Sequence, residues 1–115
     1  MNTSSIPQQL QCEADVEVVL TAPGPTWLFK HSSTCGISLA AYDEVANFLA
    51  KHVDQQVGMV VVQEHRPLSN LISNRLKFVH QSPQFFLLRD GKVAWSATHW
   101  SITADAMAAA LTKAN

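Results

Sequence analysis

Two cysteines, Cys12 and Cys35, supply the thiols of this 115-residue chain. Cys35 follows the apolar run Thr26–Phe29 and opens a segment with helical spacing, so we expect it at a strand-to-helix turn. The unpaired N–H groups of a first helical turn favour an anion. A thiol in such a place can have its pKa lowered from about 8.5 to between roughly 3.5 and 7.5. The position therefore predicts a nucleophilic thiolate, with a small buried structural cysteine as the alternative.

Ser38 stands three residues after Cys35, on the same face of the expected helix. We expect its hydroxyl to donate a hydrogen bond to the thiolate, although it cannot form a disulfide with it. The segment Cys35-Gly36-Ile37-Ser38 is thus a one-thiol version of the Cys-x-x-Cys redox pair. Such a site is restricted to exchange with an outside thiol.

The elements that must position Cys35 follow from the spacing of apolar residues. Lys30 to Thr34 are expected to form a polar turn after the first strand, and Asp90-Gly91 predicts the turn of an antiparallel hairpin. This pattern indicates an α/β fold with a central mixed four-stranded sheet flanked by helices, and leaves room for a further short strand near Leu10. The expected strands cover residues 26–29, 57–62, 85–88 and 93–97, and the expected helices cover 16–20, 35–49, 67–76 and 103–114.

Composition excludes several classes of protein. An apolar fraction of 47% is typical of one globular domain, which we place at residues 1–115. Eight Lys and Arg against nine Asp and Glu argue against nucleic-acid binding, because no positive surplus is left to neutralise phosphates. The longest apolar stretch, residues 58–62, is far shorter than the roughly 18 residues of a membrane span. The first fourteen residues lack Lys, Arg and any apolar block, so we expect a cytoplasmic protein without a secretory signal.

Four sequence blocks together resemble the monothiol bacilliredoxin family. They occur in order after Phe29 and are more specific as a set than the Cys-x-x-Ser spelling alone. One departure is conservative, since Thr98 stands where we expect Ser before the His-Trp pair. The blocks are Lys30-His31-Ser32-Ser33-Thr34-Cys35-Gly36-Ile37-Ser38, Arg66-Pro67-Leu68-Ser69-Asn70, Ser82-Pro83-Gln84 and His99-Trp100-Ser101-Ile102-Thr103.

The resemblance implies a thioredoxin-like three-layer sandwich, a catalytic Cys35 assisted by Ser38, and a cis peptide bond at Ser82-Pro83 facing the thiol. It also implies exchange with bacillithiol, a low-molecular-weight thiol that some bacteria use instead of glutathione. Bacillithiol would be a co-substrate, bacillithiolated proteins the partners, and the protein a monomer with no tightly bound cofactor. Residues expected to contact substrate are Lys30, His31, Thr34, Gly36, Arg66, Ser82 and Pro83.

Several alternatives stay open at this level. Cys-Gly-Ile-Ser is spelled nearly like the Cys-Gly-Phe-Ser of monothiol glutaredoxins, so an iron–sulfur cluster carrier is a second hypothesis. A non-catalytic thioredoxin-like interaction module is a third. Arg66 either recognises the carboxylates of bacillithiol together with Lys30, or has a structural role in which it pairs with Glu64 or caps a local turn. Cys12 is either an idle thiol or a resolving one, and the histidines lack the spacing of a zinc site.

Overall fold

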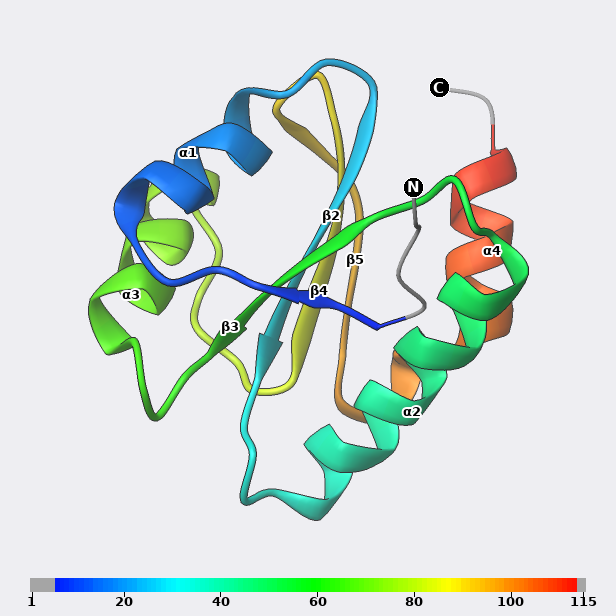
Figure 1. The fold of residues 1–115 in the computed structure, drawn as a ribbon, viewed down its shortest axis with the longest axis horizontal. Coiled ribbons are helices and arrows are strands. Elements are labelled where there is room, and N and C mark those ends of the chain that lie inside the picture. Colours follow the sequence, from blue (N-terminus) through cyan, green and yellow to red (C-terminus); the bar gives the residue numbers. More distant parts are fainter. Residues whose placement is uncertain (1–5, 114–115) are drawn as a thin grey trace.

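The computed structural model describes residues 6–113, which fold around a five-stranded sheet of order β1-β3-β2-β4-β5 (Figure 1). Strands β1, β3 and β2 are parallel, whereas β4 and β5 each run antiparallel to the preceding neighbour in that order. The elements in chain order are β1 (Gln8–Gln9), α1 (Glu13–Thr21), β2 (Pro25–His31), α2 (Gly36–Lys51), β3 (Val57–Val61), α3 (Arg66–Leu76), β4 (Gln84–Arg89), β5 (Lys92–Thr98), the 3₁₀ turn η1 (His99–Ser101) and α4 (Ala104–Thr112).

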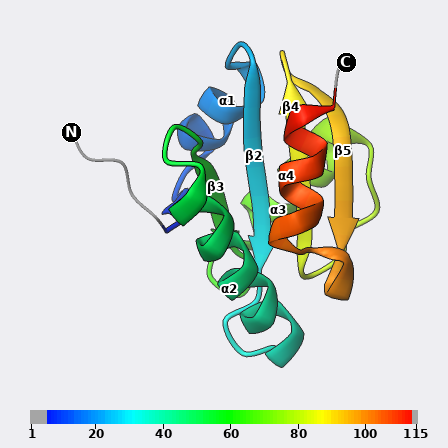
Figure 2. The same ribbon diagram turned by 90° about the vertical axis from the view of Figure 1, so that its right-hand side faces the viewer.

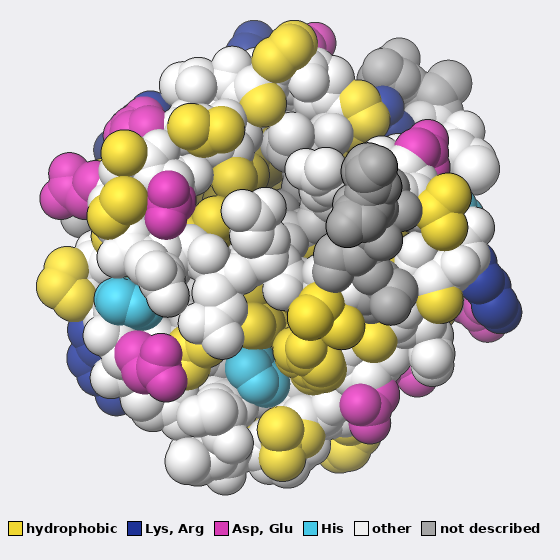
Figure 3. Space-filling model, in the orientation of Figure 1, with side chains coloured by type: hydrophobic (Ala, Val, Ile, Leu, Met, Phe, Trp, Pro, Cys, Tyr) yellow, Lys and Arg dark blue, Asp and Glu magenta, His cyan; other side chains and the backbone are white. Residues whose placement is uncertain are grey.

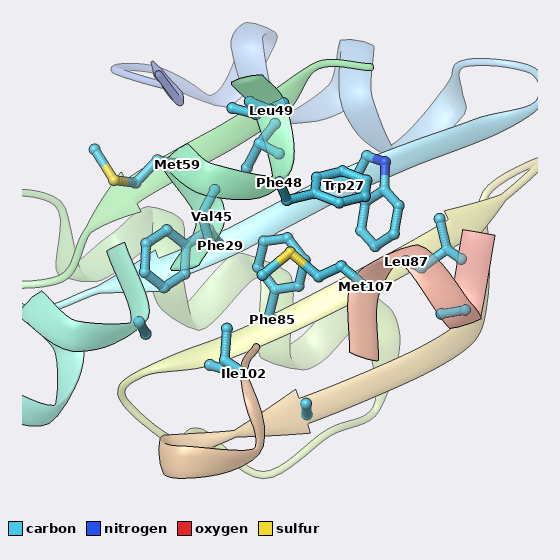
Figure 4. Close-up of a cluster of buried hydrophobic side chains, with 14 of the residues drawn as sticks. Trp27, Phe29, Val45, Phe48, Leu49, Met59, Phe85, Leu87, Ile102 and Met107 are labelled. Carbon is cyan, nitrogen blue, oxygen red and sulfur yellow. The ribbon is translucent and has the colours of Figure 1, made fainter. Parts of the chain in front are cut away.

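Both faces of the sheet are covered, which explains why its central strands are apolar without alternation. Figure 2 shows α2 and α4 in front of the sheet and α1 and α3 behind it. On the α2 side, Trp27 and Phe29 of β2 pack with Phe48 and other side chains in one buried cluster (Figure 4). On the other side, Leu28 and its neighbours form a second cluster with residues of α1 and α3. Successive residues of β2 therefore serve two separate cores.

The predicted α/β fold class is confirmed, but the sheet has five strands instead of four. The added strand, β1, is the further short strand that the sequence left open near Leu10, and it consists of two exposed glutamines. It pairs in parallel with Gly58 and Met59 of β3. A Cβ atom added at Gly58 would lie 3.0 Å from the Leu10 side chain, so the glycine makes room for the segment that follows β1.

The predicted polar turn at residues 30–34 is wrong in its first two residues. Lys30 and His31 are the last residues of β2, and both are buried. They pair with Val60 and Val61 of β3, and Lys30 also pairs with Gln84 of β4. Backbone pairing on both sides extends the strand past its apolar residues, because the sheet ladder does not depend on side-chain polarity.

The remaining elements lie close to their predicted positions. Asp90 and Gly91 turn the β4–β5 hairpin with φ of 53° and 83°, the left-handed backbone that such a turn requires. Thr103 caps α4 by accepting a hydrogen bond of 3.1 Å from the Ala106 N–H, and the predicted last residue of that helix, Ala114, lies outside the described residues. Within residues 6–113 no helix is long and apolar enough to cross a membrane. Charged and apolar side chains are interspersed on the face in Figure 3.

Candidate active site

One edge of the sheet gathers the sequence blocks that suggested chemistry. Strands β2 and β3 end at this edge, β4 begins there, and β5 ends there and leads into η1 (lower part of Figure 1). The Val62 N–H bonds the His31 carbonyl at 2.8 Å, and the His99 N–H bonds the Pro83 carbonyl at 3.1 Å. The loops that follow β2, β3 and β5 and the loop that precedes β4 thus meet in space.

Cys35 occupies the N-cap position of α2, as the strand-to-helix interpretation predicted. Its backbone is extended, with φ −104° and ψ 124°, and its carbonyl accepts the Leu39 N–H at 2.9 Å. The side chain is half-buried, carries a free thiol and makes no capping hydrogen bond. The first turn of α2 contains no acidic residue, and a Cβ added at Gly36 would meet no atom within 4 Å. The side of Gly36 next to Cys35 is therefore open toward the rest of the protein, and the first turn of α2 carries no carboxylate.

Ser38 is fully buried and holds the turn that carries Cys35. Its Oγ accepts the Ser32 N–H at 2.9 Å and lies 2.7 Å from Nδ1 of His31. The expected hydrogen bond from Ser38 to the thiol is replaced by these two contacts, because the side chain points inward toward the end of β2. Ser38 thus connects the strand, the turn and the helix that converge on Cys35.

His31 is a buried member of an aromatic group at the end of β2. Its ring centroid lies 5.3 Å from that of Phe29 and 5.4 Å from that of Tyr42. Burial lowers the pKa of His31, and a hydrogen bond with the backbone of Ser38, separate from the Oγ contact, offsets part of that effect. The neutral ring can accept the Ser38 hydroxyl proton at Nδ1, while Ser38 itself accepts from the Ser32 N–H.

Gln63 is a site residue that sequence reasoning missed. Its side-chain amide donates to Oγ of Ser32 and to Oγ1 of Thr34, both at 2.8 Å. Its carbonyl oxygen accepts the Ser33 N–H at 3.2 Å. One glutamine from the loop after β3 therefore holds all three residues that precede Cys35. No local signal marks it, since a polar residue after a strand is ordinary.

Lys30 lies on the opposite face of the sheet from His31. It is fully buried, and its Nζ lies 2.6 Å from Oγ of Ser73 and 3.2 Å from Nδ1 of His80. Burial lowers the pKa of Lys30 to about 8. Sequence reasoning expected this side chain to contact substrate, whereas the structure directs its ammonium group beneath α3 toward the loop before β4.

The remaining predicted site residues lie along the same edge. The Ser82-Pro83 peptide bond is cis, as the family resemblance implied. Pro83 is buried and immediately precedes the Lys30–Gln84 pairing, and the buried Ser82 Oγ has no hydrogen-bond partner among the described residues. Thr34 is exposed, and Arg66 is exposed at the first position of α3. The edge thus brings the predicted residues together, but from both faces of the sheet.

Cys12 is separated from this arrangement by its place in the fold. It is exposed at the N-cap of α1, a helix that packs on the α3 side of the sheet, whereas Cys35 opens α2 on the other side. Both thiols are free. Across residues 6–113 there is no group of three or more His, Cys, Asp or Glu residues that could hold a metal ion.

Solved structures with the same arrangement define the class of protein. A protein described as a candidate oxidoreductase with a thioredoxin fold is 31% identical, with a TM-score of 0.85, and the match covers 91% of this chain and 93% of that one. Thioredoxin from Trypanosoma brucei brucei is 13% identical (TM-score 0.76; 96% and 90% covered). A mutant thioredoxin from Halobacterium salinarum is 19% identical (TM-score 0.72; 93% and 88% covered). The fold is that of thioredoxin.

Residues 8–107 match the family of the monothiol bacilliredoxin BrxC. The chain therefore belongs to the monothiol bacilliredoxin family, which confirms the resemblance found in its four sequence blocks. Family and fold together identify it as a thiol redox protein, with one thiol, Cys35, at the edge described above.

Proposed function

We propose that this protein removes bacillithiol from mixed disulfides on cytoplasmic proteins. The observation that carries the proposal is the pairing of a half-buried thiol at the N-cap of α2 with a serine three residues later. A cysteine at position 38 would close an internal disulfide and release the bound thiol. Ser38 leaves the mixed disulfide on Cys35 to be resolved by a second molecule of thiol.

The exchange takes place in two balanced steps. In the first, the Cys35 thiolate attacks the bacillithiol sulfur of the mixed disulfide, so that a Cys35–bacillithiol disulfide forms as the original S–S bond breaks. The substrate protein's sulfur leaves as a thiolate and takes a proton from water. In the second, the thiolate of another bacillithiol attacks the bacillithiol sulfur held on Cys35. This step yields bacillithiol disulfide and returns Cys35 to its thiolate form.

The geometry supports particular roles for the residues around the thiol. The N–H groups at the start of α2 stabilise negative charge on sulfur, both before the attack and when Cys35 leaves in the second step. Ser38, His31 and Gln63 hold the turn in place, so they are positioning residues. We expect an extended substrate segment to bind along the open side of Gly36 and the backbone that precedes the cis Pro83.

Loss of the thiol tests the proposal directly. The substrate is a purified protein that carries bacillithiol on a single cysteine, and the measurement is release of that protein's free thiol. We expect Cys35→Ser to abolish release while retaining the fold, since the change alters little volume. Cys12→Ser is the matched control and is expected to leave the first step nearly unchanged. Comparable rates for wild type and Cys35→Ser would reject Cys35 as the nucleophile.

Mass spectrometry identifies the physiological thiol. The protein is isolated from its native cells under thiol-trapping conditions, and the mass added to Cys35 is measured. We expect the mass of bacillithiol in disulfide linkage. A different adduct, such as another small thiol, would retain the exchange chemistry and overturn the assignment of bacillithiol. An iron–sulfur cluster on protein purified without oxygen would instead favour the carrier hypothesis.

A further inference from the structure

His80, for which the sequence argued only against a zinc site, contacts two polar side chains near the active edge. It lies in the loop between α3 and β4, three residues before the cis proline. Its Nδ1 lies 3.2 Å from Nζ of Lys30 and 3.2 Å from Oγ of Ser69. An ammonium group can only donate, so Nδ1 accepts and the proton of the neutral ring lies on Nε2. Because the residue is exposed, that Nε2–H is available to a ligand.

The charge around His80 is positive and unbalanced. Desolvation, then the charges of Lys30 and Arg66, lower the pKa of His80, so the ring stays neutral near pH 7. Within residues 6–113 the single ion pair joins Arg75 to Glu17, which leaves Arg66 and the buried Lys30 without a carboxylate partner. The first turn of α3, an 11-residue helix, contains no acidic residue. Lys30 and Ser69, which lies in the first turn of α3, both contact the ring of His80 at Nδ1, and the charge of Arg66 at the start of α3 also acts on this ring. The positive charge around the exposed ring favours an anion.

We propose that the Nε2–H of His80 and the guanidinium group of Arg66 bind a carboxylate of the small thiol while its sulfur reacts at Cys35. This inference rests on the proposed function and adds the recognition of the co-substrate. Two donors suit the two oxygens of a carboxylate, and bacillithiol carries carboxylates on its malate portion. Arg66 follows β3 and His80 precedes β4, so both lie at the edge where Cys35 follows β2. The role of Lys30 is to orient the ring of His80 through the contact with Nδ1.

Exchange with matched substrates tests the carboxylate site. One peptide is prepared as its mixed disulfide with mercaptosuccinate, which is anionic, and with 2-mercaptoethanol, which is neutral. We expect Arg66→Gln to slow exchange of the anionic disulfide about tenfold and that of the neutral one less than twofold. Arg75→Gln removes the same charge from the far end of α3 and is expected to change neither rate. Equal slowing of both substrates by Arg66→Gln would overturn the site and leave Arg66 a structural role.

The His80→Asn variant distinguishes a role in binding the carboxylate from a role in supporting the loop between α3 and β4. The asparagine oxygen replaces Nδ1 as an acceptor for Lys30, but the side chain lacks a donor at the position of Nε2. We expect the same selective loss as in Arg66→Gln, with the free energy of unfolding nearly unchanged. Full retention of the preference for the anionic disulfide in His80→Asn would remove His80 from the site.

Binding of malate to Cys35→Ser protein tests the carboxylate site without disulfide exchange, so it distinguishes this site from the proposed function. In Cys35→Ser protein we expect malate to shift the backbone amide NMR signals of residues 66 and 80. Adding the Arg66→Gln substitution is expected to abolish these shifts. If the wild type exchanges no disulfide at all, the proposed function fails and the malate titration alone decides the site. Malate shifts that are absent, or spread evenly over the surface, would then refute it.

Discussion

Lys30 and His31 are neighbours in β2, yet they have different roles because their side chains point to opposite faces of the sheet. His31 faces α2 and, through Ser38, holds the turn before Cys35. Lys30 faces α3, and its ammonium group forms hydrogen bonds with Ser73 and His80. Within residues 6–113 no carboxylate pairs with this ammonium group. One face carries a neutral buried network at the thiol, whereas the other carries a buried cation.

The two faces differ in how polar groups are stabilised. Each buried contact of Ser38 satisfies a neutral group that would otherwise lose its hydrogen bond, so the network on that face contributes to stability. A buried ammonium among neutral partners retains part of its desolvation cost, so the Lys30 face is destabilised locally. Such a cost is commonly found at functional sites, which fits a role for this face in binding an anion.

Removing the Ser38 hydroxyl is expected to have the largest effect. Ser38→Ala leaves the Ser32 N–H and Nδ1 of His31 without their partner in a buried place, which costs about 2 to 3 kcal/mol in the free energy of unfolding. The looser turn is expected to slow exchange about tenfold. Chemical denaturation and thiol-release rates measure the two effects.

Ser73→Ala is the matched control on the other face. Ser73 is only half-buried, so water can replace its hydroxyl beside Lys30, and the expected cost is below about 1 kcal/mol. Equal costs for the two serine variants would remove the distinction between the faces.

Replacing Lys30 is expected to stabilise the protein. Lys30→Met removes a buried cation of similar length and is expected to raise the free energy of unfolding by about 1 to 2 kcal/mol at pH 7. Between pH 8 and 10.5 the wild-type unfolded chain keeps a proton that the folded state has released, so wild-type stability rises with pH. The rise is at most about 1.4 kcal/mol per pH unit for one group.

The comparison is between denaturation curves of wild type and Lys30→Met at several pH values. We expect the excess rise between pH 8 and 10.5 to vanish in the variant, while titration of other groups affects both proteins alike. Parallel curves across this range would show that the ammonium group is not the buried cation described above.

Gln63→Ala is expected to have a smaller effect than Ser38→Ala or Lys30→Met. Its contacts lie in an exposed loop, so the cost in unfolding free energy is about 1 kcal/mol or less, and exchange slows about two- to threefold as Ser32 to Thr34 lose their shared partner. Gln56→Ala, at the opposite end of β3, serves as the control for loss of an exposed glutamine. Rates that match in the two variants would assign Gln63 no part in positioning Cys35.

Much of the fold was predictable because its signals are local. Helical spacing after Cys35, unalternating strands at 26–29 and 57–62, and Asp90-Gly91 between two apolar runs each reflect the backbone of a single segment. For β1 the sequence left open only a short strand near Leu10, because its two exposed glutamines join the sheet through pairing with β3.

The sequence by itself determined that one thiol begins a helix after a buried strand, with a serine three residues later, and its four blocks identified the family. Only the tertiary structure decided what the polar side chains do. It directed Ser38 to His31, placed Gln63 across the turn before Cys35, and set Lys30 beneath α3 against His80. The reason is that side-chain partners at a sheet edge come from loops far apart in the chain. Which of them meet depends on how β2, β3 and β4 pair and which helix covers each face.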